Sequence, residues 1–269
     1  MNYPDDFINE IICGDCLDVM KEIPDESIDF CITSPPYDKQ RDYHGYTLNL
    51  NLLGKEIFRV LKENSICVMV IQDQTKNFRK SLTSFRTVVD WCDNVGFGLF
   101  ECCIYKRSGV PGNWWSKRFR VDHEYIPIFL KGKRPKYFNK EHMKILANQA
   151  GYKKKGKERR NDGSFTNYEF NPNRYPKKKC SGTILDYESS RASNKSLKLD
   201  HPAWFPEKLA EDFILCFTDD GDVVLDPLVG SGTVSVSAKR LERRFIGIDI
   251  SEKYCDVARM RISKIENSV

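Results

Sequence analysis

The chain has little of what membrane, secreted and metal-binding proteins need. No apolar run approaches the roughly 20 residues of a membrane helix, so we expect no membrane association. The N-terminus, residues 1–6, has neither a basic segment nor an apolar one, and we expect no signal peptide. Only 4 histidines occur in 269 residues, and no spaced histidine pair or second CxxC accompanies the CxxC at residues 13–16. We therefore expect no bound metal.

Cysteine, in contrast, is plentiful. Several of the 10 cysteines lie in apolar, strand-like runs, namely Cys31, Cys67, Cys102 and Cys103. Buried, reduced thiols in a cytoplasmic protein fit this distribution better than a disulfide framework does. A redox dithiol at the CxxC stays open as an alternative to a purely structural role.

Charge is distributed unevenly along the chain. Between Lys106 and Lys198 there are 24 Lys and Arg against 8 Asp and Glu, a local charge of +16, whereas the rest of the chain carries −11 (19 basic and 30 acidic residues). Aromatic residues such as Tyr152, Phe165 and Tyr168 are interleaved with the basic ones. This combination suits phosphate contacts and base stacking, although a solvated lysine-rich loop is the plainer alternative.

Strand-like and helical patterns alternate outside this basic stretch. Strands are expected at residues 8–13, 28–32, 65–71, 97–105, 125–130, 223–225 and 245–249, with helices at 16–23, 49–62, 81–94, 206–217, 234–241 and 252–264. Such alternation indicates an α/β fold with a mostly parallel, doubly wound sheet. We expect residues 1–104 and 200–269 to form one domain, with residues 105–199 as a basic insertion in which regular structure is hard to assign.

Two prolines stop the buried strand at residues 28–32. They belong to Thr33-Ser34-Pro35-Pro36-Tyr37, a stiff, extended turn at a strand end, where open α/β sheets bind ligands. The Ser34 hydroxyl and the Pro35 carbonyl could accept hydrogen bonds from an exocyclic amine while the Tyr37 ring stacks on the base. An ordinary strand-ending turn is the alternative.

Residues 223–249 read as a strand, a glycine turn, a helix and a second strand that ends in an acid. Gly230 and Gly232 would let a ligand approach the backbone, and Asp249 lies 23 residues beyond Asp226, near the offset of an acid that binds ribose hydroxyls. The spacing is not GxGxxG, which favours a ligand without phosphates, and Asp226 could accept from a ligand's ammonium. A tight turn with a capping aspartate is the alternative.

These segments together resemble the amino DNA methyltransferases. Residues 33–37 resemble motif IV, 226–233 motif I, 247–250 motif II, 201–207 motif X and 14–16 the acidic motif III. Their order is that of the circularly permuted β group. The resemblance implies a Rossmann-like, S-adenosylmethionine-dependent methyltransferase fold in which residues 105–199 form the target-recognition region.

The resemblance also implies roles for individual residues. Ser34, Pro35, Pro36 and Tyr37 would be catalytic. Contacts to the cofactor S-adenosylmethionine would come from Asp15, Thr33, His201, Phe205, Asp226, Leu228, Gly230, Ser231, Gly232, Thr233 and Asp249. Asp249 would hold the ribose hydroxyls and Asp15 the adenine amine. Leu228 stands where motif I usually has Phe, so an aromatic wall of the cofactor site is missing.

The expected activity is site-specific methylation of cytosine N4 in duplex DNA after base flipping. In this family, Ser directly before the two prolines of motif IV, here Ser34, favours cytosine N4, and adenine N6 is the alternative. A nucleotide-dependent oxidoreductase would need GxGxxG, and a non-catalytic DNA-binding module would leave the proline turn unexplained. RNA as substrate, a cognate restriction endonuclease and a homodimer stay open.

Overall fold

The protein folds as two compact units. A computed structural model describes residues 1–36, 48–107, 117–119, 121–146, 155–169, 178–187 and 206–266. The larger unit comprises residues 1–139 and 183–269, and the smaller one residues 140–182. Each unit is considered by itself below.

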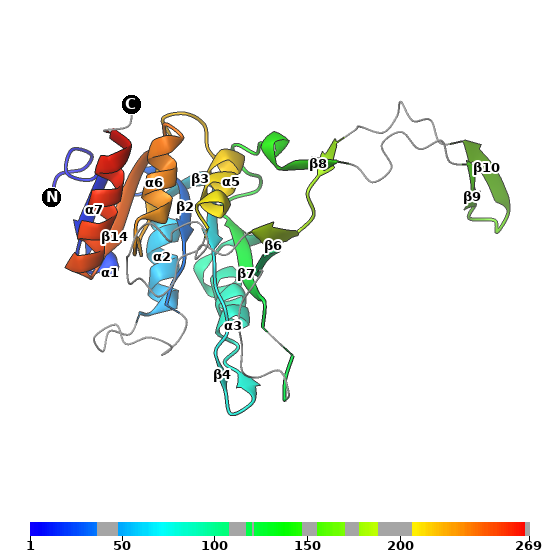
Figure 1. The fold of residues 1–269 in the computed structure, drawn as a ribbon, viewed down its shortest axis with the longest axis horizontal. Helices are drawn as coiled ribbons and strands as arrows, with labels where there is room; N and C mark the ends of the chain where they lie inside the picture. The colour runs from blue at the N-terminus through cyan, green and yellow to red at the C-terminus, as the bar shows by residue number, and fades with distance from the viewer. Residues whose placement is uncertain are drawn as a thin grey trace. The chain divides into compact units, whose positions relative to one another are not determined.

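The larger unit is built on an eight-stranded sheet (Figure 1). In spatial order its strands are β1 (Glu10–Cys13), β14 (Arg244–Asp249), β13 (Val223–Asp226), β2 (Ile28–Thr33), β3 (Leu61–Met69), β7 (His123–Leu130), β6 (Gly98–Arg107) and β12 (Ile184–Tyr187). The first five run parallel, β7 is antiparallel to both of its neighbours, and β12 is parallel to β6. The predicted mostly parallel sheet is confirmed.

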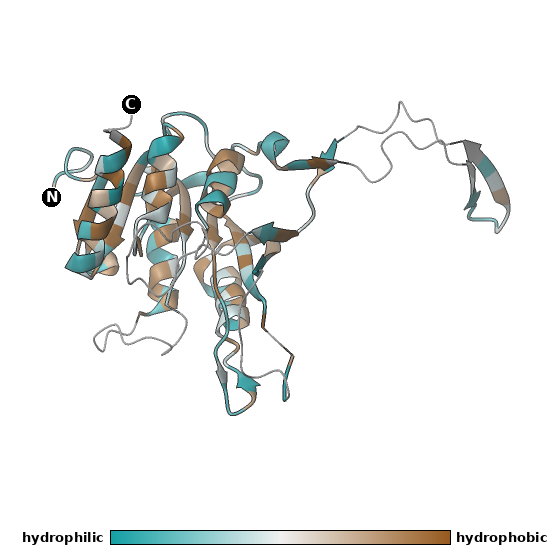
Figure 2. Ribbon diagram, in the orientation of Figure 1, coloured by the Kyte–Doolittle hydropathy of each residue, from teal (hydrophilic) through white to brown (hydrophobic). Residues whose placement is uncertain are grey.

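Two groups of helices cover the sheet. One consists of α5 (Glu207–Phe217), α6 (Thr233–Arg240) and α7 (Glu252–Glu266); the other of α1 (Cys16–Lys21), α2 (Leu50–Val60) and α3 (Thr83–Asp90), which continues as the π-helical turn η1 (Trp91–Val95). Figure 2 shows hydrophobic residues concentrated on the central strands. Helices on both faces explain why β2 is buried at all six positions. No helix in the described ranges combines the length and apolar composition needed to span a bilayer.

The two ends of the chain meet in the sheet. β1, near the N-terminus, pairs with β14, near the C-terminus, so that Ile12 lies opposite Ile248. β13 in turn pairs with β2, where Leu225 lies opposite Cys31. Four neighbouring parallel strands from opposite ends of the chain therefore finish at one edge of the sheet.

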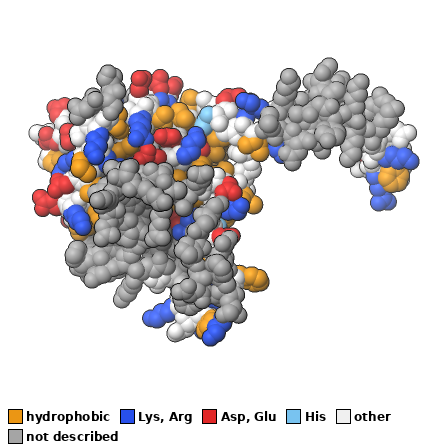
Figure 3. All heavy atoms as spheres, viewed as in Figure 1, with side chains coloured by type: hydrophobic (Ala, Val, Ile, Leu, Met, Phe, Trp, Pro, Cys, Tyr) orange, Lys and Arg blue, Asp and Glu red, His pale blue; other side chains and the backbone are white. Residues whose placement is uncertain are grey.

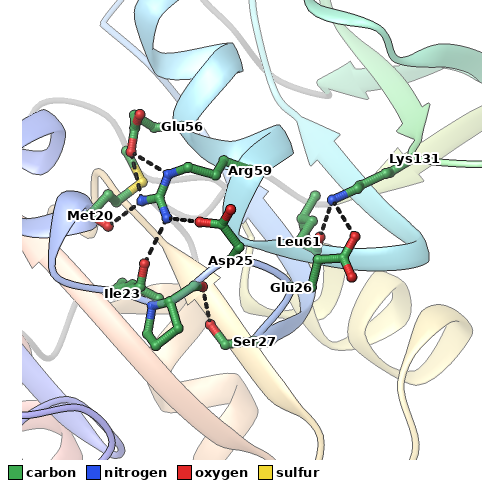
Figure 4. Close-up of polar contacts among 10 residues, drawn as sticks. Met20, Ile23, Asp25, Glu26, Ser27, Glu56, Arg59, Leu61 and Lys131 are labelled. Carbon is green, nitrogen blue, oxygen red and sulfur yellow. Dashed lines mark hydrogen bonds and ion pairs between the residues drawn. The ribbon is translucent and has the colours of Figure 1, made fainter.

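Two basic side chains hold the connections at the other edge (Figure 4). The Arg59 guanidinium donates to two carbonyls. One is that of Met20, in the last turn of α1, at 2.6 Å, and the other is that of Ile23, just after α1, at 2.9 Å. Lys131 Nζ donates to the Leu61 carbonyl at 2.7 Å, where β3 begins. These bonds add side-chain donors to carbonyls at the ends of α1 and β3, and they fix the chain where it enters β2 and β3.

Short strands also occur where the sequence predicted no regular structure. Between β3 and α3, β4 (Thr75–Lys76) pairs with β5 (Arg79–Lys80) in a hairpin. The smaller unit contains the 3₁₀ turn η2 (Glu141–Met143) and two antiparallel pairs: β8 (Lys144–Leu146) with β11 (Lys178–Cys180), and β9 (Lys155–Arg159) with β10 (Phe165–Glu169). The smaller unit, residues 140–182, therefore covers fewer residues than the insertion predicted at 105–199, because β7 and β12 belong to the main sheet.

Candidate active site at the carboxyl ends of four strands

The proline motif lies directly after β2. The Thr33 carbonyl accepts a hydrogen bond from Val70 N at 2.9 Å, so the ladder between β2 and β3 extends to this point. Residues 34–36 then leave the sheet, because the prolines cannot donate to a ladder. Pro35 is buried, and Ser34 is half-buried. The structure thus places Ser34 at the carboxyl edge of the sheet, as predicted.

Asp226 ends β13, the strand next to β2. Its carboxylate accepts a hydrogen bond from Leu228 N at 3.1 Å, and the residue is only 2% exposed. Burial raises the pKa of Asp226 to about 7; the charge of Asp249 adds to this, while the Leu228 N–H and the Thr33 hydroxyl oppose it. The Thr33 hydroxyl lies beside the carboxylate without full hydrogen-bond geometry. Asp226 therefore joins the end of β13 to the end of β2.

The glycine turn after β13 reaches over the end of β14. Gly230 N donates to the Asp249 carboxylate at 2.9 Å. Gly230 and Gly232 have φ of 50° and 82°, in the left-handed region that favours glycine. A Cβ at Gly232 would stand 2.7 Å from the Cβ of Ala258 on α7. Both the conformation and the close approach of α7 therefore require glycine at position 232.

Asp249 is held by backbone donors on both sides. Besides Gly230 N, it accepts a hydrogen bond from Ser251 N at 2.8 Å. Burial raises the pKa of Asp249, and the two backbone N–H groups oppose that shift. Two carboxylate oxygens offer about four acceptor positions, so this carboxylate retains capacity for a ligand.

Asp15 lies at the same edge, after β1. Cys13 pairs with Asp249 in the sheet, and Gly14 N donates to the Asp249 carbonyl at 2.9 Å. Asp15 is the N-cap of α1 and accepts a hydrogen bond from Leu17 N at 2.8 Å. The structure therefore brings Asp15, Asp226 and Asp249 to one edge together with Ser34.

Ser231 and Thr233 are buried, and their hydroxyl oxygens lie 3.5 Å apart. Ser231 accepts bonds from the Arg261 guanidinium at its carbonyl, 2.6 Å, and its hydroxyl, 3.2 Å. Arg261 also pairs with Glu207 of α5, and its side chain is 4% exposed. Arg261 is a positioning residue that the sequence analysis missed. Its place three residues after Ala258, on the buried face of α7, was the available signal.

Other predicted site residues have different outcomes. Leu228 is half-buried and packs against the hydrophobic core. Tyr37, His201 and Phe205 lie outside the described residues, and their roles stay predictions.

The CxxC combines an exposed thiol, Cys13, with a buried one, Cys16. All ten cysteines are free thiols. Cys16 is buried, and burial, with the charge of Asp15, raises the pKa of its thiol to about 12. Such a thiol is a poor nucleophile at neutral pH. Among the described residues, no three His, Cys, Asp or Glu side chains are grouped as metal ligands.

The fold and the motif order define a Rossmann-like methyltransferase of the circularly permuted type. A family model described as DNA methylase, covering N6- and N4-methylating enzymes, matches residues 28–260. The chain belongs to this family of DNA methylases.

Individual relatives agree with this assignment. The orphan methyltransferase M.BamHII of Bacillus amyloliquefaciens is 34% identical over 255 residues, which cover 90% of this chain and 92% of the relative. The type II methyltransferase M.HinfI of Haemophilus influenzae is 29% identical, over 97% of this chain and 70% of the relative.

Two solved structures share the fold. The PvuII DNA methyltransferase (cytosine-N4-specific) aligns with a TM-score of 0.68 at 22% identity, over 96% of this chain and 89% of that one. M1.HpyAVI in complex with SAM aligns with a TM-score of 0.63 at 21% identity, over 94% and 98%. The predicted family, its action on DNA and its cofactor, S-adenosylmethionine, are thereby confirmed at the level of the family, which includes both N4-cytosine and N6-adenine enzymes.

Replacing Gly232 with Ala should destabilise the fold more than replacing Gly221 does. Gly221 has a similar φ of 77° but nothing within 4 Å of an added Cβ. Gly221→Ala should therefore cost about 1–2 kcal/mol from backbone strain alone. Gly232→Ala should cost about 1–3 kcal/mol more, because Ala258 must move. Urea unfolding of both variants measures the difference; equal losses would show that α7 does not press on this turn.

Proposed function

We propose that this enzyme transfers a methyl group from S-adenosylmethionine to N4 of cytosine in duplex DNA. The observation that carries the proposal is the adjacency of Ser34, at the end of β2, to Asp226, at the end of β13. The turn proposed to bind the amine, at the end of β2, then lies next to the proposed site of the methyl donor, at the end of β13. The neutral Ser at the first position of motif IV favours cytosine, and the PvuII enzyme of the same fold is described as cytosine-N4-specific.

The acids at this edge fit the proposed cofactor. Asp226 and Asp249 both have raised pKa values, and no cation among the described groups accounts for a counter-charge. A ligand that carries positive charge and hydroxyl donors would favour the ionised carboxylates, whereas a phosphate would be repelled. S-adenosylmethionine supplies an electrophilic methyl group on a positively charged sulfur. We assign Asp226, Gly230 and Gly232 to its methionine part, Asp249 to its ribose and Asp15 to its adenine amine.

Motif IV then prepares the nucleophile. The lone pair of an exocyclic amine is delocalised into the ring, which makes the amine a weak nucleophile. By accepting its hydrogens, Ser34 Oγ and the Pro35 carbonyl make the nitrogen more tetrahedral and return the lone pair to it. The transfer would form an N–C bond and break the C–S bond of the sulfonium, leaving a neutral thioether, and the proton lost by the amine would pass to solvent. Positioning at the strand ends supplies much of the rate gain.

Access to this edge requires the target base to leave the duplex. Tyr37 would stack on the flipped base. In this scheme Tyr37 transfers no proton. Its role is to hold the plane of the flipped base beside Ser34.

Target recognition is assigned to the basic insertion at residues 105–199. Within this range, the β9–β10 hairpin of the smaller unit carries the exposed Phe165 and the exposed basic residues Lys157, Arg159 and Arg160. Basic side chains around an exposed aromatic ring suit a nucleic-acid surface. A cognate endonuclease and a homodimer remain open as further partners, and a cytoplasmic location is supported by the ten free cysteines.

The proposed base is tested by product analysis. Duplex DNA methylated by the enzyme with labelled S-adenosylmethionine is digested to nucleosides and analysed by mass spectrometry. We expect the label on N4-methylcytosine. Label on N6-methyladenine would overturn the choice of base while leaving the methyltransferase assignment intact, and competition by RNA at fixed salt tests the nucleic acid used.

Cofactor affinity should depend on pH through Asp226. With a pKa of about 7 in the free protein, Asp226 is largely protonated below that pH, and binding of a cation must then release this proton. Affinity for S-adenosylmethionine should fall by up to about tenfold per pH unit below about pH 7 and level off above it. Titration calorimetry across this range measures the effect.

Two variants separate Asp226 from its neighbour. Asp226→Asn should bind weakly and without the step near pH 7. Asp249→Asn removes an acid of the same edge and should keep that step, at a somewhat lower pH, because the charge of Asp249 contributes to the raised pKa of Asp226. A wild-type affinity that is flat across pH 7 would contradict the placement of the cationic group beside Asp226.

A further inference from the structure

The β4–β5 hairpin stands outside the region expected to contact DNA. It follows β3, whose last residue, Met69, lies opposite Thr33 at the end of β2. It therefore starts at the edge of the sheet that carries Ser34, and it projects from the unit as a narrow arm (Figure 1). Its four strand residues pair Thr75 with Lys80 and Lys76 with Arg79.

The tip of the hairpin exposes an aromatic ring on a backbone conformation that is unfavourable for a bulky residue. Asn77 and Phe78 have φ of 50° and 61°, the left-handed conformation that a two-residue hairpin turn requires. Glycine is the favoured second residue of such turns, and a bulky residue with positive φ is uncommon. Phe78 is nevertheless placed there and is 63% exposed. An exposed ring on a strained turn is typical of a contact site, because packing within the fold does not explain it.

The sides of the hairpin are basic. Lys76 and Arg79 are exposed, and Figure 3 shows basic and hydrophobic side chains together at the lower tip of the larger unit. Lys80 lies near Arg118, from the segment between β6 and β7. Burial and the charge of Arg118 lower the pKa of Lys80, against the opposing charge of Asp73. Arg118 Nη1 is buried and has no hydrogen-bond partner among the residues that the structure describes. The charges of Lys80 and Arg118 therefore add to the positive field at the base of the hairpin.

The base of the hairpin is firmly anchored. The Asp73 carboxylate is buried and accepts hydrogen bonds from Ser84 N at 2.9 Å, Ser84 Oγ at 2.8 Å and Ser81 Oγ at 3.3 Å. Lys80 Nζ donates to the Asp73 carbonyl at 3.2 Å. This network ties both ends of the hairpin to the first turn of α3, so the arm is held in a defined direction.

We propose that the β4–β5 hairpin forms a second duplex-DNA contact, separate from the basic insertion. Lys76 and Arg79 bind backbone phosphates, and Phe78 stacks against a base step next to the flipped nucleotide. The inference rests on action on duplex DNA and is independent of which base is methylated. A wedge at this place would lower the cost of unstacking the target.

Binding to a labelled mixed-sequence duplex, followed by fluorescence anisotropy over a series of salt concentrations, tests the proposal. Lys76→Ala with Arg79→Ala should reduce the slope of log affinity against log salt by about 2, one unit for each lost phosphate contact. Phe78→Ala should weaken binding about tenfold at fixed salt, and Phe78→Tyr should restore it. Affinity for S-adenosylmethionine should stay unchanged in all variants.

Matched controls lie elsewhere in the larger unit. Lys21→Ala, at the end of α1, removes an exposed lysine, and Met260→Ala, on α7, removes an apolar side chain that is 41% exposed. Both should bind duplex as the wild type does. Wild-type affinity and salt slope in the hairpin variants would overturn the proposal.

Two further outcomes separate this inference from others. If Phe78→Ala changes the sedimentation of the DNA-free protein and leaves duplex affinity intact, the hairpin belongs to a protein interface and the proposal is overturned. If methylation occurs at adenine while the hairpin variants lose duplex affinity, the hairpin contact stands and only the proposed base fails.

Discussion

The parallel alignment of β1, β14, β13 and β2 is the constraint on which the site depends. Parallel neighbours bring their carboxyl ends to one edge of a sheet, whatever the distance between them along the chain. Here β1 and β2 come from the first 33 residues, and β13 and β14 from the last 50. The edge therefore collects Asp15, Ser34, Asp226 and Asp249 only once both ends of the chain have joined the sheet.

Buried charge is the second physical feature of the site. Asp226 and Asp249 are held among backbone donors, and burial raises the pKa of both. Arg261, also buried, holds the opposite side of the glycine turn through Ser231. Arg261 thus holds the buried side of the glycine turn, and the acids Asp226 and Asp249 lie on the side of the turn at the strand ends. Such an arrangement favours a ligand that brings its own positive charge and disfavours one that brings phosphates.

Local patterns in the sequence were sufficient for seven of the eight strands of the sheet and for the strand ends at which the candidate site lies. Prolines after a buried run located the end of β2, and the glycine turn with Asp249 located the ends of β13 and β14. Residues that act through distant partners were missed. Arg261 gained its role only from contact with Ser231, 30 positions earlier.

Elements of two to five residues were missed for a related reason. β4 and β5 have two residues each, too few for a periodic pattern, and the turn between them lacks the glycine that usually signals a hairpin. β12 lies in the last part of the basic insertion, after the smaller unit, and is defined by its pairing with β6, for which its own four residues give no signal. The roles of Tyr37, His201 and Phe205 remain predictions.

The central claim is that Ser34 acts on the amine at the edge where the donor binds. Single-turnover methyl transfer by Ser34→Ala, measured beside its affinities for S-adenosylmethionine and duplex DNA, tests this most directly. The account predicts that the transfer rate falls about a hundredfold, while both affinities stay within a factor of about two of the wild type. An unchanged transfer rate would contradict it, as would a loss that follows cofactor affinity alone.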